Sequence, residues 1–311
     1  MISAKTYSKA ISIEHAISLA KENEGKSRFL AGGTDVIVNK YQGNDDSDVL
    51  IDISGIAALK EITVSETFLS IGSLVCLEDL QFHSKITELF PLLSEAAHSV
   101  ASPTIRKTAT LGGNLLCENR CSFYNQSEWW REAAGYCLKC NGNTCLATGG
   151  TKNCLSKFVS DTAVALISLF ANIEVMDSRG KTIIPLENIY SGDGVNPRLL
   201  SQDSLIVAIH LPLNESIRAV YKKLRKRETL DFTSLTTSVS IDDTGKIRIV
   251  LGGVHTKPVI VDGFMGDDLE SLTSQAISNT RLVDNDTYSK SYRKEMIPVF
   301  LKRSFKQLGL I

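Results

Sequence analysis

The chain has 311 residues, of which 43% are hydrophobic, and this length and composition allow a full core in one segmented domain or in two domains. The formal net charge is −1, with 34 lysines and arginines against 35 aspartates and glutamates, which excludes the strongly basic surface typical of nucleic-acid-binding proteins. The sequence has no run of about 18 apolar residues that could span a membrane and no signal-peptide core near its start. We therefore expect a cytoplasmic protein with no nucleic-acid or membrane partner, whose cysteines are reduced.

The first part of the chain predicts alternating helices and strands. Residues 12–24 have apolar side chains at helical spacing, and Ser12 can cap the start of that helix. Residues 28–30 predict a short strand, which leads into a glycine turn at 31–35 and then an apolar segment at 36–38. The other elements expected here are strands at 49–53 and 68–71 and a helix at 89–100.

The second part continues this alternation. It predicts a helix at 160–170, strands at 172–176, 182–185 and 205–211, a hairpin of strands 236–241 and 247–252, and helices at 269–278 and 288–308. The pattern indicates an α+β fold. We expect a first domain at 1–214 and a smaller domain of one sheet and helices at 215–311.

Two glycine turns each combine a threonine, paired glycines and a polar side chain. The first is Ala31-Gly32-Gly33-Thr34-Asp35 and the second is Thr110-Leu111-Gly112-Gly113-Asn114. Paired glycines allow a positive φ and a close backbone approach, and a threonine hydroxyl can bind a phosphate oxygen. Neither turn matches G-x-G-x-x-G or G-x-x-x-x-G-K-[ST], which disfavours the nicotinamide and P-loop folds. A dinucleotide held between two loops is one interpretation, and two turns that serve chain geometry alone are the other.

Six of the seven cysteines lie between Cys117 and Cys154. Clustered reduced thiols are typical metal ligands, and the spacing of Cys137 and Cys140 suits zinc and iron–sulfur sites alike. Cys117 and Cys121 would supply a second zinc knuckle. Spacing alone leaves open a zinc site, an iron–sulfur cluster and cysteines without a metal. A zinc-stabilised scaffold protein without a redox role is therefore one hypothesis.

Several short segments stand out when they are considered together. They are AGGTD at 31–35, Ile71-Gly72-Ser73, Ser102-Pro103-Thr104-Ile105-Arg106 leading into TLGGN at 110–114, and Ser160-Asp161. Together they resemble the flavoprotein subunit of the xanthine dehydrogenase family of molybdenum hydroxylases, over essentially the whole chain. The resemblance implies an FAD-binding domain of two α+β subdomains of the molybdopterin dehydrogenase (PCMH) type, and a C-terminal α+β domain like that of the carbon monoxide dehydrogenase flavoprotein.

The same resemblance implies contacts with FAD and no catalytic acid or base. It puts the pyrophosphate on the backbone of residues 31–35, with Thr110, Gly113 and Asn114 on the second side. Asp161 would be hydrogen-bonded to the adenine-side portion, and Lys223 would lie close to the isoalloxazine ring. For Lys223, a solvated position in a run of basic residues is the alternative. The implied cofactor-binding residues are Leu30, Ala31, Gly32, Gly33, Thr34, Asp35, Thr110, Leu111, Gly112, Gly113, Asn114, Asp161 and Lys223.

A cysteine-rich insert at about 117–157 separates the second glycine turn from Asp161, and it reads RCSFYNQSEWWREAAGYCLKCNGNTC at 120–145. It resembles the insert of the 4-hydroxybenzoyl-CoA reductase branch of the family, whose β subunits carry a [4Fe–4S] cluster. The resemblance implies four cluster ligands, Cys121, Cys137, Cys145 and Cys154, and leaves Cys117 and Cys140 as spare thiols.

The function implied by this resemblance is an electron relay. Electrons would pass from ferredoxin through the [4Fe–4S] cluster and FAD to a [2Fe–2S] small subunit and a molybdenum-cofactor large subunit. That enzyme would reduce 4-hydroxybenzoyl-CoA to benzoyl-CoA in aromatic compound degradation. The alternative is a molybdenum hydroxylase that oxidises an aldehyde, a purine or another heterocycle, with FAD passing electrons to NAD or another acceptor.

Overall fold

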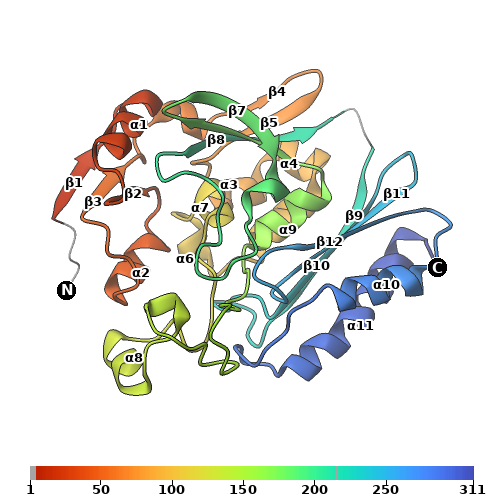
Figure 1. Cartoon of the computed structure of the whole chain (residues 1–311). Coiled ribbons are helices and arrows are strands. Elements are labelled where there is room, and N and C mark those ends of the chain that lie inside the picture. Colours follow the sequence, from red (N-terminus) through yellow and green to blue (C-terminus); the bar gives the residue numbers. More distant parts are fainter. Residues whose placement is uncertain (1–4, 214–215) are drawn as a thin grey trace.

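The computed structural model describes residues 5–213 and 216–311, and its three sheets follow one another along the chain (Figure 1). The predicted division between residues 214 and 215 lies outside the described residues. Within the described ranges, no helix is long and apolar enough to cross a membrane. The mixture of helices and separate sheets confirms the expected α+β class.

The first sheet is parallel, with the strand order β1-β3-β2. Its strands are β1 (Thr6–Lys9), β2 (Ser27–Leu30) and β3 (Val49–Asp52). Helix α1 (Ile13–Glu22) joins β1 to β2, and the Ser12 side chain caps it by accepting a hydrogen bond from the N–H of His15, as the sequence predicts. The apolar segment at 36–38 is the first turn of a helix, α2 (Val36–Tyr41).

The second sheet has five antiparallel strands in the order β4-β5-β8-β6-β7. They are β4 (Ile62–Val64), β5 (Phe68–Gly72), β6 (Asn172–Asp177), β7 (Gly180–Pro185) and β8 (Leu205–Pro212). The helical elements of this region are η1 (Ala57–Lys60), α3 (Leu77–Phe82), α4 (Ser84–Leu89), α5 (Pro91–His98), α6 (Pro103–Arg106), α7 (Leu111–Leu115), α9 (Asp161–Ser168) and η3 (Leu186–Ile189).

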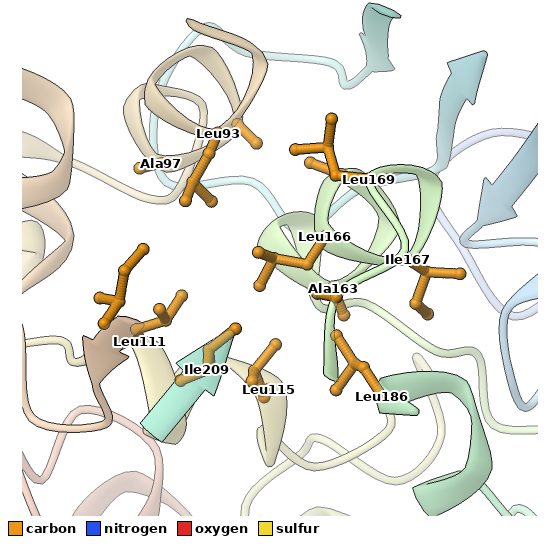
Figure 2. Close-up of a cluster of buried hydrophobic side chains, with 14 of the residues drawn as sticks. Leu93, Ala97, Leu111, Leu115, Ala163, Leu166, Ile167, Leu169, Leu186 and Ile209 are labelled. Atoms are coloured by element: carbon orange, nitrogen blue, oxygen red, sulfur yellow. The ribbon is translucent and has the colours of Figure 1, made fainter. Parts of the chain in front are cut away.

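Helix α9 lies at the centre of the main core. All of its residues are buried, which is the pattern of a helix enclosed on every side. Figure 2 shows Leu166 of α9 between Leu93 of α5 and Ile209 of β8, and all three side chains are fully buried. The core therefore fixes the N-terminus of α9 against α7, which carries the second glycine turn.

The third sheet is antiparallel, in the order β12-β11-β10-β9. Its strands are β9 (Arg218–Leu224), β10 (Leu235–Ile241), β11 (Lys246–Gly252) and β12 (Val259–Phe264), and α10 (Leu269–Ser278) and α11 (Lys290–Leu308) pack on it. The predicted hairpin is formed by β10 and β11. In its turn, Asp242 Oδ1 accepts the N–H of Thr244, and Gly245 has a φ of +82°.

The cysteine-rich insert has little regular structure besides α8 (Glu128–Ala134) and η2 (Leu138–Cys140). Arg131 of α8 is 1% exposed and donates to the carbonyl of Gln42, just after α2, and to Glu128. Helices α8 and α2 accordingly lie side by side (Figure 1). The insert is thus docked against the element that follows the first glycine turn.

Candidate functional site

A cavity of about 510 Å³ lies where the two glycine turns meet. The first turn lines it from Ala31 to Asp35, and the second contributes Thr110, Gly112 and Gly113. The segment at 195–198 forms another part of the wall. This volume is typical of a small-molecule or cofactor pocket.

Glycine is required where the turns come together. A Cβ on Gly32 would lie 1.7 Å from the carbonyl oxygen of Thr108, and one on Gly112 would lie 2.8 Å from Cβ of Ser73. Gly33 has a φ of +73°, which side-chain-bearing residues rarely adopt. The first turn therefore touches the chain that leads into the second.

The two turns differ in the use of their backbone N–H groups. In the second turn, the N–H of Gly112 donates to the carbonyl of Ser73 and that of Gly113 to Oγ1 of Thr110. In the first turn, the N–H groups of residues 32–35 donate no hydrogen bond within the described chain. Only the first turn thus offers a group of free N–H donors, and such a group can bind an anion.

Asp35 holds the first turn in place. Its carboxylate accepts the N–H of Glu118 at 2.9 Å and is ion-paired with Arg120. Burial lowers the pKa of Arg120 to about 10, and its guanidinium lies 4.5 Å from the ring centre of Phe232. Asp35 therefore connects the turn to the start of the insert.

Three cations line the large cavity, and one of them differs from the others. Arg28 is paired with Asp45 at 2.8 Å and Lys139 with Glu118 at 3.0 Å. Arg198 donates only to the carbonyls of Cys117 and Pro197 among the described residues, and its Nε has no partner there. Arg198 was not predicted, because a lone arginine between Pro197 and Leu199 carries no motif.

Some predicted contacts lie away from this cavity. Asn114 accepts hydrogen bonds from Thr162 Oγ1 at 2.6 Å and Ser160 Oγ at 3.0 Å, so it binds the start of α9, whose N-cap is Ser160. Lys223 Nζ lies 2.6 Å from Asp161 Oδ2, and both side chains are buried. The predicted FAD-binding residues that do not line the cavity are Leu30, Leu111, Asn114, Asp161 and Lys223. Their contact with FAD stays a prediction.

A second, much smaller cavity lies within the insert. Its volume is about 10 Å³, and its lining includes the four cysteines that were predicted as ligands, Cys121, Cys137, Cys145 and Cys154. The predicted spare thiols, Cys117 and Cys140, are not part of this lining. The structure thus brings four thiols together from separate segments of the insert.

Burial and neighbouring thiols shift the pKa values of several cysteines of the insert. Burial raises the pKa of Cys121 to about 11, and Cys154 and Cys137 add to the effect. Burial also raises the pKa of Cys117 to about 12. A hydrogen bond from the Cys140 thiol lowers the pKa of Cys137. Without a metal, Cys117 and Cys121 therefore hold their protons at neutral pH, whereas Cys137 ionises more readily.

In their present positions, the four cysteines hold neither a zinc ion nor an iron–sulfur cluster. Among residues 5–213 and 216–311, no group of three or more His, Cys, Asp or Glu side chains is arranged to hold a metal ion. A zinc ion needs four ligands at about 2.0–2.3 Å, so the side chains as they stand do not form a zinc site. Four cysteines match the donor set of a [4Fe–4S] cluster. Because a 10 Å³ cavity holds about one water molecule, they would have to turn outward to make room.

The chain is similar to proteins of known activity. The aldehyde oxidoreductase FAD-binding subunit of Escherichia coli is 30% identical over 272 residues, which are 85% of each chain. The xanthine dehydrogenase FAD-binding subunit of Escherichia coli is 26% identical over 319 residues, 97% of this chain and 95% of that one. Carbon monoxide dehydrogenase from Hydrogenophaga pseudoflava has the same fold, with a TM-score of 0.78 at 19% identity over 98% of this chain and 97% of that chain.

A family model supports the same assignment. The model described as the FAD binding domain in molybdopterin dehydrogenase matches residues 3–214, which include both glycine turns and the cysteine insert. The family match thus supports FAD as the cofactor independently of the glycine motifs. The chain belongs to the family of FAD-binding subunits of molybdopterin-containing oxidoreductases.

Proposed function

We propose that this chain is the electron-relay subunit of a molybdenum oxidoreductase, with FAD in the large cavity and a [4Fe–4S] cluster on Cys121, Cys137, Cys145 and Cys154. The observation that carries the proposal is that these four thiols line one cavity. The zinc scaffold hypothesis is disfavoured, because the chain belongs to an FAD-binding family of oxidoreductases.

When both cofactors are bound, FAD exchanges one or two electrons and the cluster exchanges one at a time, which together suit a relay. The chain itself binds and orients them. The free N–H groups of residues 32–35 are the donors that we assign to the FAD pyrophosphate. We retain Asp161 and Lys223 as FAD contacts, and these two residues would then turn from each other toward the ligand.

The substrate would bind in a partner subunit, and two activities are candidates. The resemblance of the insert favours reduction of 4-hydroxybenzoyl-CoA, with ferredoxin as the electron donor. The 30% identity to an aldehyde oxidoreductase subunit favours aldehyde oxidation. In both cases we propose a molybdenum-cofactor large subunit and a [2Fe–2S] small subunit as partners, in the cytoplasm. Assays of the co-purified complex with 4-hydroxybenzoyl-CoA and with aldehydes would distinguish the two activities by showing which compound is turned over.

The first test is cofactor analysis of protein purified without oxygen together with its partners. We expect one FAD and four irons with matching sulfide for each chain, after the partners' cofactors have been subtracted. Zinc without iron or flavin would overturn the relay. FAD without iron would leave a flavoprotein and refute the cluster.

The ligand assignment is tested by single substitutions. Cys121→Ser and Cys145→Ser should remove the broad visible absorbance of the cluster and leave FAD bound, because neither cysteine lines the large cavity. Cys140→Ser and Cys76→Ser are matched controls, since neither thiol lines the cysteine cavity. Full iron content in both ligand variants would refute the assignment. Loss of iron in Cys140→Ser would mean that Cys140 is a ligand in place of one of the four.

A further inference from the structure

Two side chains, Tyr124 and Lys139, line the large cavity and the cysteine cavity at once. Lys139 belongs to η2, between Cys137 and Cys140, and its side chain is only 3% exposed. Its ammonium group lies 5.2 Å from the ring centre of Tyr124. A buried charge is unfavourable unless it is fully paired. The hydrogen-bond partners of the Lys139 ammonium group therefore indicate its role.

On one side, Lys139 is connected to the first glycine turn. Its Nζ donates to Glu118 Oε1 at 3.0 Å, and Glu118 lines the large cavity. The N–H of Glu118 in turn donates to Asp35 at 2.9 Å. A continuous series of polar contacts thus runs from the cysteine insert to the turn that we assign to the FAD pyrophosphate.

On the other side, Lys139 holds a loop that packs on a cysteine. Its Nζ donates to the carbonyls of Gly194 at 2.6 Å and Val195 at 3.2 Å, which completes its three donors. The Gly194 carbonyl also accepts from Ser156 Oγ at 2.9 Å. A Cβ on Gly194 would lie 2.9 Å from Sγ of Cys154. The loop therefore forms part of the wall around that thiol.

We propose that Lys139 is a positioning residue that couples the two cofactor sites, an inference that rests on the proposed function. With a cluster bound, the Lys139 charge would favour its reduced form, because an electron from a low-potential one-electron donor would add one negative charge close to a fixed positive charge. Its hydrogen bonds hold Glu118 and Val195 in the wall of the FAD cavity.

The test compares Lys139→Met, Lys139→Arg and the control Lys152→Met, an exposed lysine of the same insert, in the complex purified without oxygen. Two quantities are measured: the cluster midpoint potential, by dithionite titration followed by electron paramagnetic resonance, and the FAD dissociation constant, by flavin fluorescence. Lys139→Met should shift the potential to more negative values and weaken FAD binding about tenfold. Lys139→Arg should retain most of both properties, and Lys152→Met should equal the wild type.

The double variant Lys139→Met with Glu118→Gln separates charge from geometry. It removes both members of the ion pair, so the midpoint potential should return toward the wild-type value while FAD binding stays weak. Unchanged potential and affinity in Lys139→Met with four irons bound would overturn the coupling alone. Wild-type protein without iron would overturn the proposed function, and the coupling with it.

Discussion

Arg198 is the cation of the large cavity that has no carboxylate partner among the described residues, whereas Arg28 and Lys139 each have one. FAD carries a doubly charged pyrophosphate, and a hydrogen bond to a charged group contributes about 1.5–3 kcal/mol. We therefore expect Arg198→Gln to weaken FAD binding about tenfold or more, measured by fluorescence titration of the flavin-free protein. The exposed Arg179→Gln on the β6–β7 turn is the control. An unchanged dissociation constant for Arg198→Gln would refute this role.

His255 links stability to pH. Burial, followed by the charges of Arg281 and Lys257, lowers the pKa of His255 to about 4, whereas an unfolded histidine has a pKa of about 6.5. The unfolded chain thus binds a proton between these values while the folded chain does not, so the stability contributed by the neutral ring is complete above pH 6.5 and declines toward pH 4. The free energy of unfolding, measured with urea at pH 7.5 and at pH 5, should fall less between these two pH values in His255→Gln than in wild type. The exposed His98→Gln should lose as much as wild type, and an equal loss in both variants would contradict the assignment.

At the level of elements, the close contact of the first glycine turn with Thr108 gives a sharp test. Because a Cβ on Gly32 would lie 1.7 Å from a backbone oxygen, Gly32→Ala must displace the turn and misalign its free N–H groups. We expect Gly32→Ala to lose most FAD during purification while the fold is retained, measured as the flavin-to-protein ratio and far-UV circular dichroism. In Gly55→Ala the nearest atom is the flexible end of Lys9, so its flavin content should stay normal.

Local sequence signals explain which elements could be predicted. Helices α1, α9 and α10 and the β10–β11 hairpin carry a cap, an apolar pattern or a turn sequence of their own. Helix α2 could not be recognised, since Val36, Ile37 and Val38 have a preference for strands. Helix α7 contains two glycines and exists because Thr110 caps it and Leu111 and Leu115 are buried. Helix α7 therefore depends on its cap and on tertiary packing.

The site was predictable only in part, for a related reason. The glycine turns were recognised from their composition, but the different use of their N–H groups depends on Ser73 and Thr110, which no motif includes. The common cavity of the four cysteines is also a tertiary property, because irregular segments join them. Asp161 and Lys223 were selected by resemblance, and their pairing with each other required the structure.

Across the whole molecule, the C-terminal segment closes the insert. The backbones of Arg120 and Lys157 form an isolated antiparallel β-bridge, which joins the two ends of the insert. Asn285 then binds both ends, accepting the N–H of Ser122 on its carbonyl and donating its side-chain N–H to the carbonyl of Leu155. The part of the chain after the third sheet therefore stabilises a segment that lies about 130 residues earlier.

Asp286 is the charged centre of this closure. Its side chain is 5% exposed and forms ion pairs with Lys157 and, at 3.7 Å, with Arg293, both of which are buried. Asp286→Asn would leave two buried cations without a counter-charge, which costs about 3–5 kcal/mol and should lower the Tm by roughly 6 °C or more. Asp284→Asn is the matched control, because Asp284 is 58% exposed and lies 3.9 Å from Lys290. Scanning calorimetry of the two variants should show a large loss of Tm for Asp286→Asn alone. Equal values would mean that the ion pairs do not stabilise the closure, and that the hydrogen bonds of Asn285 hold the insert without them.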